Sequence, residues 1–329
     1  MKLNKGVFAV IIFATLLTGC RDKVEKKSPI TTTYKETWSA PDTSEIPQTE
    51  EGNLIKYGRT LVINTAAFFG PKGSIAHVSN GMNCQNCHLN AGTKPFGNNF
   101  SLVATGYPRY KDRSASVETF VKKINDCFER SLDGKKIDTS SREMKAFVAY
   151  VKWVGKGVAK GSKPYGSGIE ELSFSKTAAD TAIGHKVYML QCAKCHGNTG
   201  QGVLDANGIA YVYPPLWGSH SYNIGASIYR ISKFAGYVKN NMPFGINHDS
   251  SVLSVADAWN VAAFVNAQPH PYKNLAKDWP KAGTKPYDYP FGPYTDGFSE
   301  TQHKYGPFDP IKKALQKQNS SKQKTAFKS

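Results

Sequence analysis

Two pentapeptides, CQNCH at residues 84–88 and CAKCH at residues 192–196, decide the fold of this chain. The pattern C-x-x-C-H arises by chance only about 0.003 times in a sequence of this composition, so two occurrences need a chemical reason. Two cysteines at this spacing can attach covalently to one porphyrin, and the adjacent histidine then lies beneath the iron as its proximal ligand. The sequence therefore predicts two covalently bound haem c groups. Their attachment residues are Cys84, Cys87 and His88 for the first and Cys192, Cys195 and His196 for the second.

Other uses of these cysteines are disfavoured. A structural zinc site needs four ligands near one another, whereas the two pairs are far apart in the sequence and each has its own histidine. Haem attachment consumes both pairs, so Cys20 and Cys127 are the two of the six cysteines that remain. No disulfide is therefore expected.

Amphipathic helices are predicted on both sides of each motif. An apolar pattern with helical spacing over residues 53–69 leads into the first motif, and a similar pattern over 177–192 leads into the second. Further helices are predicted over 141–154 and 254–267, with aromatic residues that can pack on the opening helices. Each half thus has the order of a class I cytochrome c domain.

The fold class that follows is all-α, with two class I cytochrome c domains in tandem and an extended C-terminal tail. We expect the N-terminal domain at residues 51–160 and the C-terminal domain at 169–268, joined by a glycine-rich linker at 155–168. Residues 269–329 are rich in Pro, Tyr, Lys and Gly, so we expect an extended segment that wraps over the body and ends in a disordered basic tip.

The N-terminus has the features of a lipoprotein signal peptide. Two lysines precede the apolar run 7–17, and the sequence Leu-Thr-Gly-Cys ends at Cys20. The apolar run is too short to span a bilayer. We therefore predict a signal peptide at 1–19, lipidation of Cys20 and a flexible tether at 20–50. The protein would lie in the cell envelope, facing the periplasm and held to the membrane by its lipid alone, and Arg21 favours the outer membrane.

The strong positive charge favours anionic partners. The chain has 42 Lys and Arg against 25 Asp and Glu, a net charge of +17. Export and the lack of a recognised motif argue against nucleic acid. Small anions, acidic redox proteins and anionic lipid headgroups remain, because a basic surface raises the local concentration of anions.

Each haem iron also needs a distal ligand. In the second domain we predict Met242, because it lies in a polar loop before Pro243, whereas a methionine within a helical pattern is usually core filler. His248 and His270 are the alternatives.

The first domain has no comparable methionine, and Cys127 is the remaining candidate. Lysine, arginine and polar residues surround it in the sequence, and such surroundings favour the reactive thiolate over an inert buried thiol. A buried structural cysteine is the alternative. The surrounding residues are Lys122, Lys123, Asn125, Arg130 and Ser131.

The sequence from about residue 52 to 315 resembles the thiosulfate dehydrogenases, a family of tetrathionate-forming dihaem cytochromes. The segment around Cys127, INDCFERS at 124–131, is the most diagnostic part. The other matching segments are CQNCHL at 84–89, AGT at 91–93, Tyr107, Pro108, Tyr110, Arg113, YPPLWG at 213–218, NMP at 241–243 and YGPF at 305–308.

The resemblance implies a catalytic haem with His88 and Cys127 as axial ligands, and an electron-transfer haem with His196 and Met242. It implies oxidation of two thiosulfates to one tetrathionate, reversible in some members, with electrons passing to a soluble or membrane-bound cytochrome. It also implies that Ser131 helps to hold the substrate and that Lys123 stands where many members have arginine, which offers a bidentate fork that lysine lacks. The alternative function is an electron-transfer cytochrome with no substrate of its own.

Overall fold

The computed structural model describes residues 36–326, with side chains described to residue 318. The predicted signal peptide, Cys20 and the first part of the predicted tether lie outside the described residues. Within residues 36–326, no helix is both long and apolar enough to cross a membrane.

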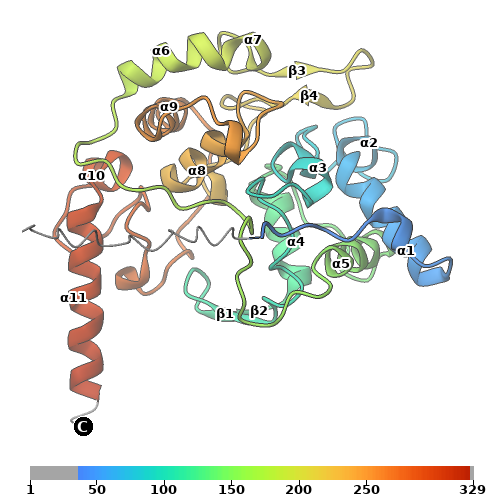
Figure 1. The fold of residues 1–329 in the computed structure, drawn as a ribbon, viewed down its shortest axis with the longest axis horizontal. Helices are drawn as coiled ribbons and strands as arrows, with labels where there is room; N and C mark the ends of the chain where they lie inside the picture. Colours follow the sequence, from blue (N-terminus) through green and yellow to red (C-terminus); the bar gives the residue numbers. More distant parts are fainter. Residues whose placement is uncertain (1–35, 327–329) are drawn as a thin grey trace, which may run out of the picture. The chain divides into compact units, whose positions relative to one another are not determined.

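The N-terminal half is helical apart from one short hairpin (Figure 1). Its elements are the 3₁₀ turn η1 (Thr43–Glu45), α1 (Glu50–Ile63), α2 (Thr65–Phe69), η2 (Cys84–Asn86), α3 (Leu89–Gly92), β1 (Arg109–Lys111), β2 (Ser116–Glu118), α4 (Phe120–Arg130) and α5 (Arg142–Val154). The two strands pair antiparallel, with Arg109 opposite Glu118.

The C-terminal half repeats the order of helix, attachment motif and closing helix. Its elements are α6 (Thr181–Gln191), α7 (Ala193–His196), β3 (Val203–Leu204), β4 (Tyr211–Tyr213), η3 (Ser227–Tyr229), α8 (Ile231–Asn241), η4 (His248–Ser250) and α9 (Val255–Ala267). The chain then continues through η5 (Ala282–Thr284), α10 (Glu300–Tyr305) and α11 (Asp309–Ala326). Helices therefore form at all four predicted places, and the all-α prediction of two tandem cytochrome c domains is confirmed.

Five of the longer helices begin where the sequence offers a capping side chain. A side-chain oxygen of the residue before each helix accepts a hydrogen bond from a backbone N–H of the first turn, which would otherwise have no partner. These N-cap residues are Thr49 before α1, Thr119 before α4, Ser141 before α5, Asp180 before α6 and Ser254 before α9.

In each half, the opening helix packs on the closing helix at a glycine. Helix α1 lies against α5, and α6 lies against α9. A Cβ atom at Gly58 would lie 2.0 Å from the carbonyl oxygen of Ala146, and one at Gly184 would lie 2.0 Å from that of Asn260. Because only glycine lets the backbones approach so closely, both helix pairs depend on it at equivalent places.

The prediction of a flexible tether to residue 50 is wrong for residues 36–49. The side chain of Ile46 is only 3% exposed, and the backbone N–H of Trp38 donates to the carbonyl of Tyr165 at 2.8 Å. Lys156 also pairs with Glu45 at 2.8 Å. Burial of an apolar side chain holds this segment against the N-terminal half.

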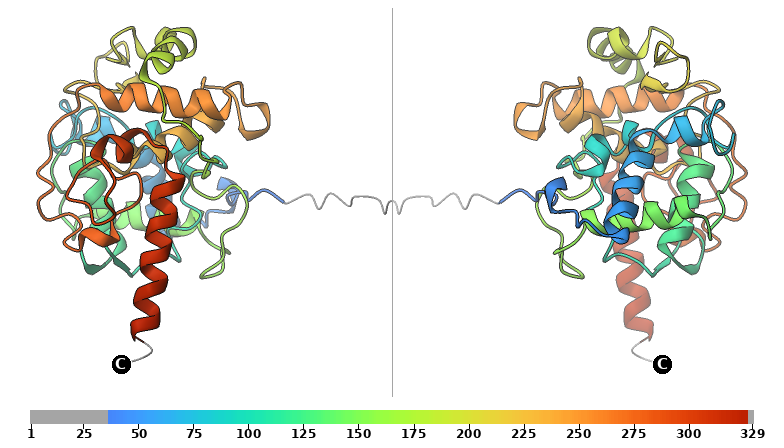
Figure 2. Two further views of the ribbon diagram at one scale, coloured as in Figure 1. Left: turned by 90° about the vertical axis from the view of Figure 1, so that its left-hand side faces the viewer. Right: turned by 90° about the vertical axis from the view of Figure 1, so that its right-hand side faces the viewer.

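The C-terminal tail is irregular at first and helical at its end. The structure forms α10 within the segment expected to be extended and α11 at its end, where a disordered tip was expected, and much of α11 extends beyond the other helices in both views of Figure 2. Several contacts anchor the tail; among them, Ile311 is fully buried, and the buried carboxylate of Asp288 accepts hydrogen bonds from Arg230 and Ser232. The irregular part, 269–299, lies alongside both halves.

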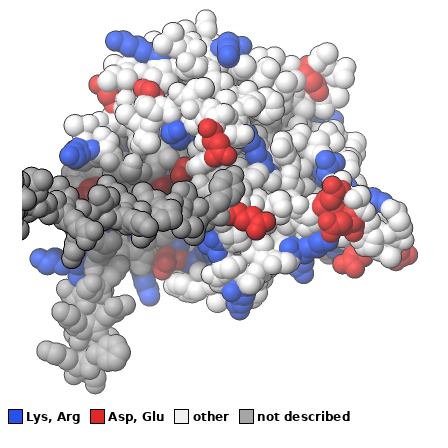
Figure 3. Space-filling view, in the orientation of Figure 1, with Lys and Arg blue, Asp and Glu red and all other residues white. Residues whose placement is uncertain are grey.

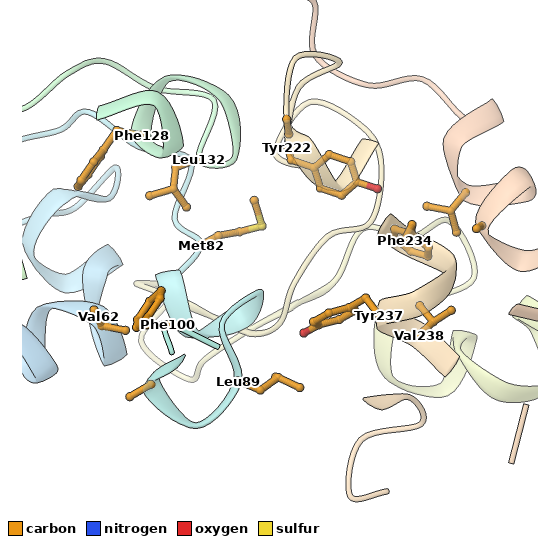
Figure 4. Close-up of a cluster of buried hydrophobic side chains, with 14 of the residues drawn as sticks. Val62, Met82, Leu89, Phe100, Phe128, Leu132, Tyr222, Phe234, Tyr237 and Val238 are labelled. Atoms are coloured by element: carbon orange, nitrogen blue, oxygen red, sulfur yellow. The ribbon is translucent and has the colours of Figure 1, made fainter. Parts of the chain in front are cut away.

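The two halves share one buried core. Figure 4 shows Tyr222 and Tyr237 of the C-terminal half facing Met82 and Leu89 of the N-terminal half. The hydroxyl of Tyr237 donates to the carbonyl of Asn86, inside the first attachment motif, at 3.1 Å. The second half therefore packs directly against the segment that carries the first motif.

Candidate haem and substrate sites

The first attachment motif opens onto a cavity of about 750 Å³. Cys84, Cys87 and His88 line it, and so does Cys127 from α4. The structure thus brings together the four residues predicted for the first haem site. Much of the remaining lining is apolar, including Val62, Phe100, Leu132, Phe147 and Val151.

His88 is held in the orientation and charge state of a metal ligand. Its Nδ1 lies 2.5 Å from the carbonyl oxygen of Asn98, to which it can only donate, so its Nε2 keeps a free lone pair. Burial lowers the pKa of His88 to about 4, which keeps the imidazole neutral. The ring also packs on Phe100, with the centroids 4.6 Å apart. A second hydrogen bond of this kind is typical of metal-bound histidine.

Helix α4 presents Cys127 to the cavity together with two polar side chains. Lys123 lies four residues before it and Ser131 four residues after it, and residues at this spacing share one face of a helix. All three line the cavity. The structure therefore groups the three residues predicted to be catalytic.

The other predicted neighbours of Cys127 have structural partners. Lys122 pairs with Glu118 at 2.7 Å and with Asp126 at 2.9 Å, and Asn125 exchanges hydrogen bonds with the backbone of Ile137. Neither is a cavity residue. The prediction that both surround the thiol is wrong, because they lie on other faces of the helix.

Arg130 does not line the cavity either. It pairs with Asp278 in the tail through two hydrogen bonds of 2.7 and 2.8 Å. Arg113 does line the cavity, but it donates to Asp126 at 2.9 Å. Lys123 makes no ion pair with any carboxylate of the described residues. Among the predicted cations it is therefore the one whose charge no carboxylate offsets.

Further parts of the chain reach the cavity without a sequence prediction, and three of them bring cations or an aromatic side chain. The segment before and within β1 contributes Tyr107, Arg109 and Lys111, the start of α8 contributes Arg230 and Lys233, and the tail contributes Trp279. Alternation in β1 places Arg109 and Lys111 on one side of the strand. This i, i+2 spacing is the signal in the sequence that could have placed both cations on the same side. A three-residue strand is, however, too short to be recognised from a pattern.

The positive charge is not concentrated on the outer face shown in Figure 3. Lys and Arg side chains are scattered there between acidic and neutral residues. The cavity contrasts with this face, because cations from α4 and β1 converge on it. These cavity cations attract anions to the space that Cys127 lines.

The second motif has the same proximal arrangement. The Nδ1 of His196 lies 2.8 Å from the carbonyl oxygen of Pro214, and burial lowers the pKa of this histidine. Met242 is half-buried and directly follows α8, with its N–H donating to Val238. Its polar neighbour Asn241 is fully buried and donates to the carbonyls of Phe96 and Tyr237.

The two alternative distal ligands have other contacts. Both ring nitrogens of His270 lie 3.2 Å from backbone carbonyls, those of Tyr222 and Val265. His248 stacks on Phe96, with the ring centroids 4.3 Å apart, and its Nδ1 lies 2.9 Å from Asp249. These contacts weaken the case for either histidine as an iron ligand.

The chemistry of both sites fits a covalently bound haem. The five described cysteines form no disulfide, so both pairs are available for attachment. Each adjacent histidine is buried or half-buried and oriented by a carbonyl, and the first cavity has the size and apolar lining of a site for a large cofactor. Covalent haem would be held by Cys84, Cys87 and His88 in the first half and by Cys192, Cys195 and His196 in the second.

Family models match both halves of the chain. The SoxA/TsdA cytochrome c domain matches residues 74–159, and the cytochrome c family matches residues 181–269. Together with the two attachment motifs, these matches define a c-type cytochrome with two covalently bound haem c groups.

Comparison with individual proteins is more specific. The chain is 34% identical over 231 residues to a thiosulfate dehydrogenase of Stutzerimonas stutzeri, covering 70% of this chain and 72% of that one. It is 35% identical over 259 residues to a thiosulfate dehydrogenase of Psychrobacter arcticus, covering 78% and 76%. The chain belongs to the thiosulfate dehydrogenase family.

A solved structure supports the same fold. The chain is similar to a thiosulfate dehydrogenase (TsdBA) from Marichromatium purpuratum in its "as isolated" form, with a TM-score of 0.66 and 28% sequence identity. The match covers 83% of this chain and 54% of that longer chain.

Proposed function

We propose that this protein oxidises two thiosulfate ions to one tetrathionate, and that it can also run this reaction in reverse. The catalytic haem would have His88 and Cys127 as its axial ligands. The electrons would leave through the second haem, with His196 and Met242 as ligands. Membership of the thiosulfate dehydrogenase family and the presence of two haem domains support this activity.

The observation that carries the proposal is the position of the Cys127 thiol. It lines the same cavity as Cys84, Cys87 and His88 of the first attachment motif. Lys123 and Ser131 flank it on the cavity face of α4. A sulfur nucleophile, a cation without an ion pair and a hydroxyl thus face one space, which suits a sulfur-containing dianion.

Cys127 would leave the haem iron and act as the nucleophilic sulfur in two steps. In the first, a bond forms between its thiolate sulfur and the sulfane sulfur of thiosulfate, and two electrons are released. In the second, the sulfane sulfur of another thiosulfate attacks that same sulfane sulfur, the bond to Cys127 breaks, and tetrathionate leaves with the thiolate restored. Two bound haems supply places for the two electrons, which can leave one at a time. Lys123 and Ser131 would hold the charged sulfonate end during both steps.

The electron acceptor would be a soluble or membrane-bound cytochrome. The second motif lies in a domain that matches the general cytochrome c family, whereas the first matches the more specialised SoxA/TsdA domain. This difference supports a division between a catalytic haem and an electron-transfer haem.

The test is Cys127→Gly in the haem-loaded protein. Glu129→Gly is the matched control, because it carries the same cost of about 1 kcal/mol for glycine in a helix and Glu129 does not line the cavity. Thiosulfate oxidation with an artificial electron acceptor should be lost in Cys127→Gly and retained in Glu129→Gly, while both variants keep two haems.

Near-normal thiosulfate oxidation by Cys127→Gly would refute the catalytic role of the thiol. A wild-type protein with both haems but no activity on thiosulfate or tetrathionate would instead favour an electron-transfer cytochrome. Spin-resonance spectra of the wild-type protein provide an independent readout, since a thiolate-ligated haem differs from a methionine-ligated one.

We also propose that the protein is anchored in the cell envelope by a lipid on Cys20, facing the periplasm. The support is the signal-like sequence that ends at Cys20. Cys20→Ser should move the protein from the detergent phase to the aqueous phase in a partition experiment. Equal partition of the variant and the wild type would contradict lipidation.

A further inference from the structure

We propose that Arg109 and Lys111 form an outer oxyanion site, which binds the second thiosulfate and the far sulfonate of tetrathionate. This inference rests on the proposed thiosulfate chemistry and specifies where the second substrate binds. Both residues belong to β1, and both line the cavity that holds Cys127.

The two cations are supported by an aromatic ring. The guanidinium carbon of Arg109 lies 5.1 Å and the amine of Lys111 5.7 Å from the ring centroid of Tyr107. Tyr107 in turn packs on Phe120, the first residue of α4, with the centroids 5.9 Å apart. Contacts between cations and an aromatic face restrict flexible side chains. The hairpin and the helix that carries Cys127 are therefore held together at this point.

Neither cation is neutralised by an ion pair. Lys122 and Arg113, which lie close by in the sequence, are paired with Glu118 or Asp126. Arg109 and Lys111 have no such carboxylate within 4.0 Å among the described residues. Burial, together with the charges of Arg109, Lys123 and Arg113, lowers the pKa of Lys111 to about 8 despite the opposing effect of Glu118. A cluster of unneutralised cations is unfavourable by itself and is relieved by a bound anion.

The cations form a path from the solvent to the first haem site. Arg109 is exposed and Lys111 is partly buried, and Lys123 lines the same cavity from α4, four residues before Cys127.

The shape of the product fits two separated anion sites. Tetrathionate carries one sulfonate at each end, joined through two sulfane sulfurs. If its inner sulfonate contacts Lys123 and Ser131, its outer sulfonate needs a second cationic site further from Cys127. Arg109 and Lys111 are the cavity cations on that side without an ion pair. The same site would hold the second thiosulfate before it attacks the adduct on Cys127.

The test compares Lys111→Gln, Arg109→Gln and the charge-preserving Lys111→Arg in the haem-loaded protein. The matched control is Lys160→Gln, an exposed lysine outside the cavity. Loss of one charge-assisted hydrogen bond should raise the KM for thiosulfate and the Kd for tetrathionate, measured by calorimetry, about tenfold in each Gln variant. Lys111→Arg and the control should stay within about twofold of the wild type.

Haem content and the midpoint potentials of both haems provide the readout that separates substrate from cofactor. They should be unchanged in all four variants. A shifted potential or reduced haem content with unchanged KM would mean that the pair binds the haem carboxylates, and would overturn the proposal. Unchanged KM and Kd in both Gln variants would also overturn it, while leaving the proposed function intact. If the wild type neither oxidises thiosulfate nor binds tetrathionate, the proposed function itself fails.

Discussion

The pair between Arg130 and Asp278 should be one of the strongest single links between α4 and the tail. The side chains are only 14% and 11% exposed, and the guanidinium makes two hydrogen bonds to the carboxylate. One nitrogen also donates to the carbonyl of Gly225 at 3.3 Å. The pair therefore joins the helix of Cys127 to the tail and to the second half.

Asp278→Leu would leave the buried guanidinium without its counter-charge. Removal of one partner from a buried pair costs about 3–5 kcal/mol, and the slight exposure here reduces the expected loss to about 2–4 kcal/mol. For a domain of this size, each kcal/mol corresponds to about 2–4 °C in Tm, so the variant should unfold roughly 5–15 °C below the wild type.

The assay is a double-mutant cycle on the haem-loaded protein, in which circular dichroism measures the Tm of each variant during heating. Its members are Arg130→Met, Asp278→Leu and the double variant. Each single change should be strongly destabilising, whereas the double variant should regain much of the loss because no buried charge is left alone. Single variants that each lower Tm by less than about 2 °C, or a coupling energy below about 0.5 kcal/mol, would refute the reasoning.

Two further predictions concern packing and pH. Gly184→Ala should destabilise the protein by about 1–3 kcal/mol, the usual cost of overpacking, because the new Cβ would meet the backbone of α9. The control Lys186→Ala, on the exposed side of α6, should change stability by less than about 0.5 kcal/mol. Equal melting curves for the two variants would contradict the close approach of α6 and α9. The KM for thiosulfate should rise as the pH passes about 8, because Lys111 then loses its proton and its charge while thiosulfate stays a dianion. Lys111→Gln should remove this rise, although Arg109, Arg113, Lys123 and Glu118 also face the same region; a rise of equal size in the variant would refute its assignment to Lys111.

The features that sequence reasoning predicted well are local. The attachment motifs are set by spacing along the chain, and the four principal helices follow from apolar periodicity and from capping residues such as Thr49 and Ser254. The closing helices were expected to pack on the opening ones, and they do. The glycines at the two helix crossings were not singled out, since a close approach is visible only when both helices are in place.

The errors arose where the direction of a side chain decides its role. Lys122 and Lys123 are neighbours in the sequence, yet one pairs with Glu118 and Asp126 while the other lines the cavity. Successive residues of a helix point about 100° apart, so composition around Cys127 could not separate them. Residues 36–49 were expected to be flexible because they are polar, but the buried Ile46 and contacts with Tyr165 and Lys156 hold them.

The sequence by itself determined the cofactor chemistry of this protein, because covalent haem attachment depends on residues within five consecutive positions. It also determined the helical repeat, because amphipathic periodicity is a property of one segment at a time. The tertiary structure alone decided which cations face the thiol of Cys127. The cations that face the thiol come from segments far apart in the chain, and other cations are already paired with carboxylates, as Arg130 is with Asp278 of the tail. Neither the contacts between the β1 hairpin, α4 and the tail nor these ion pairs can be read from one segment alone.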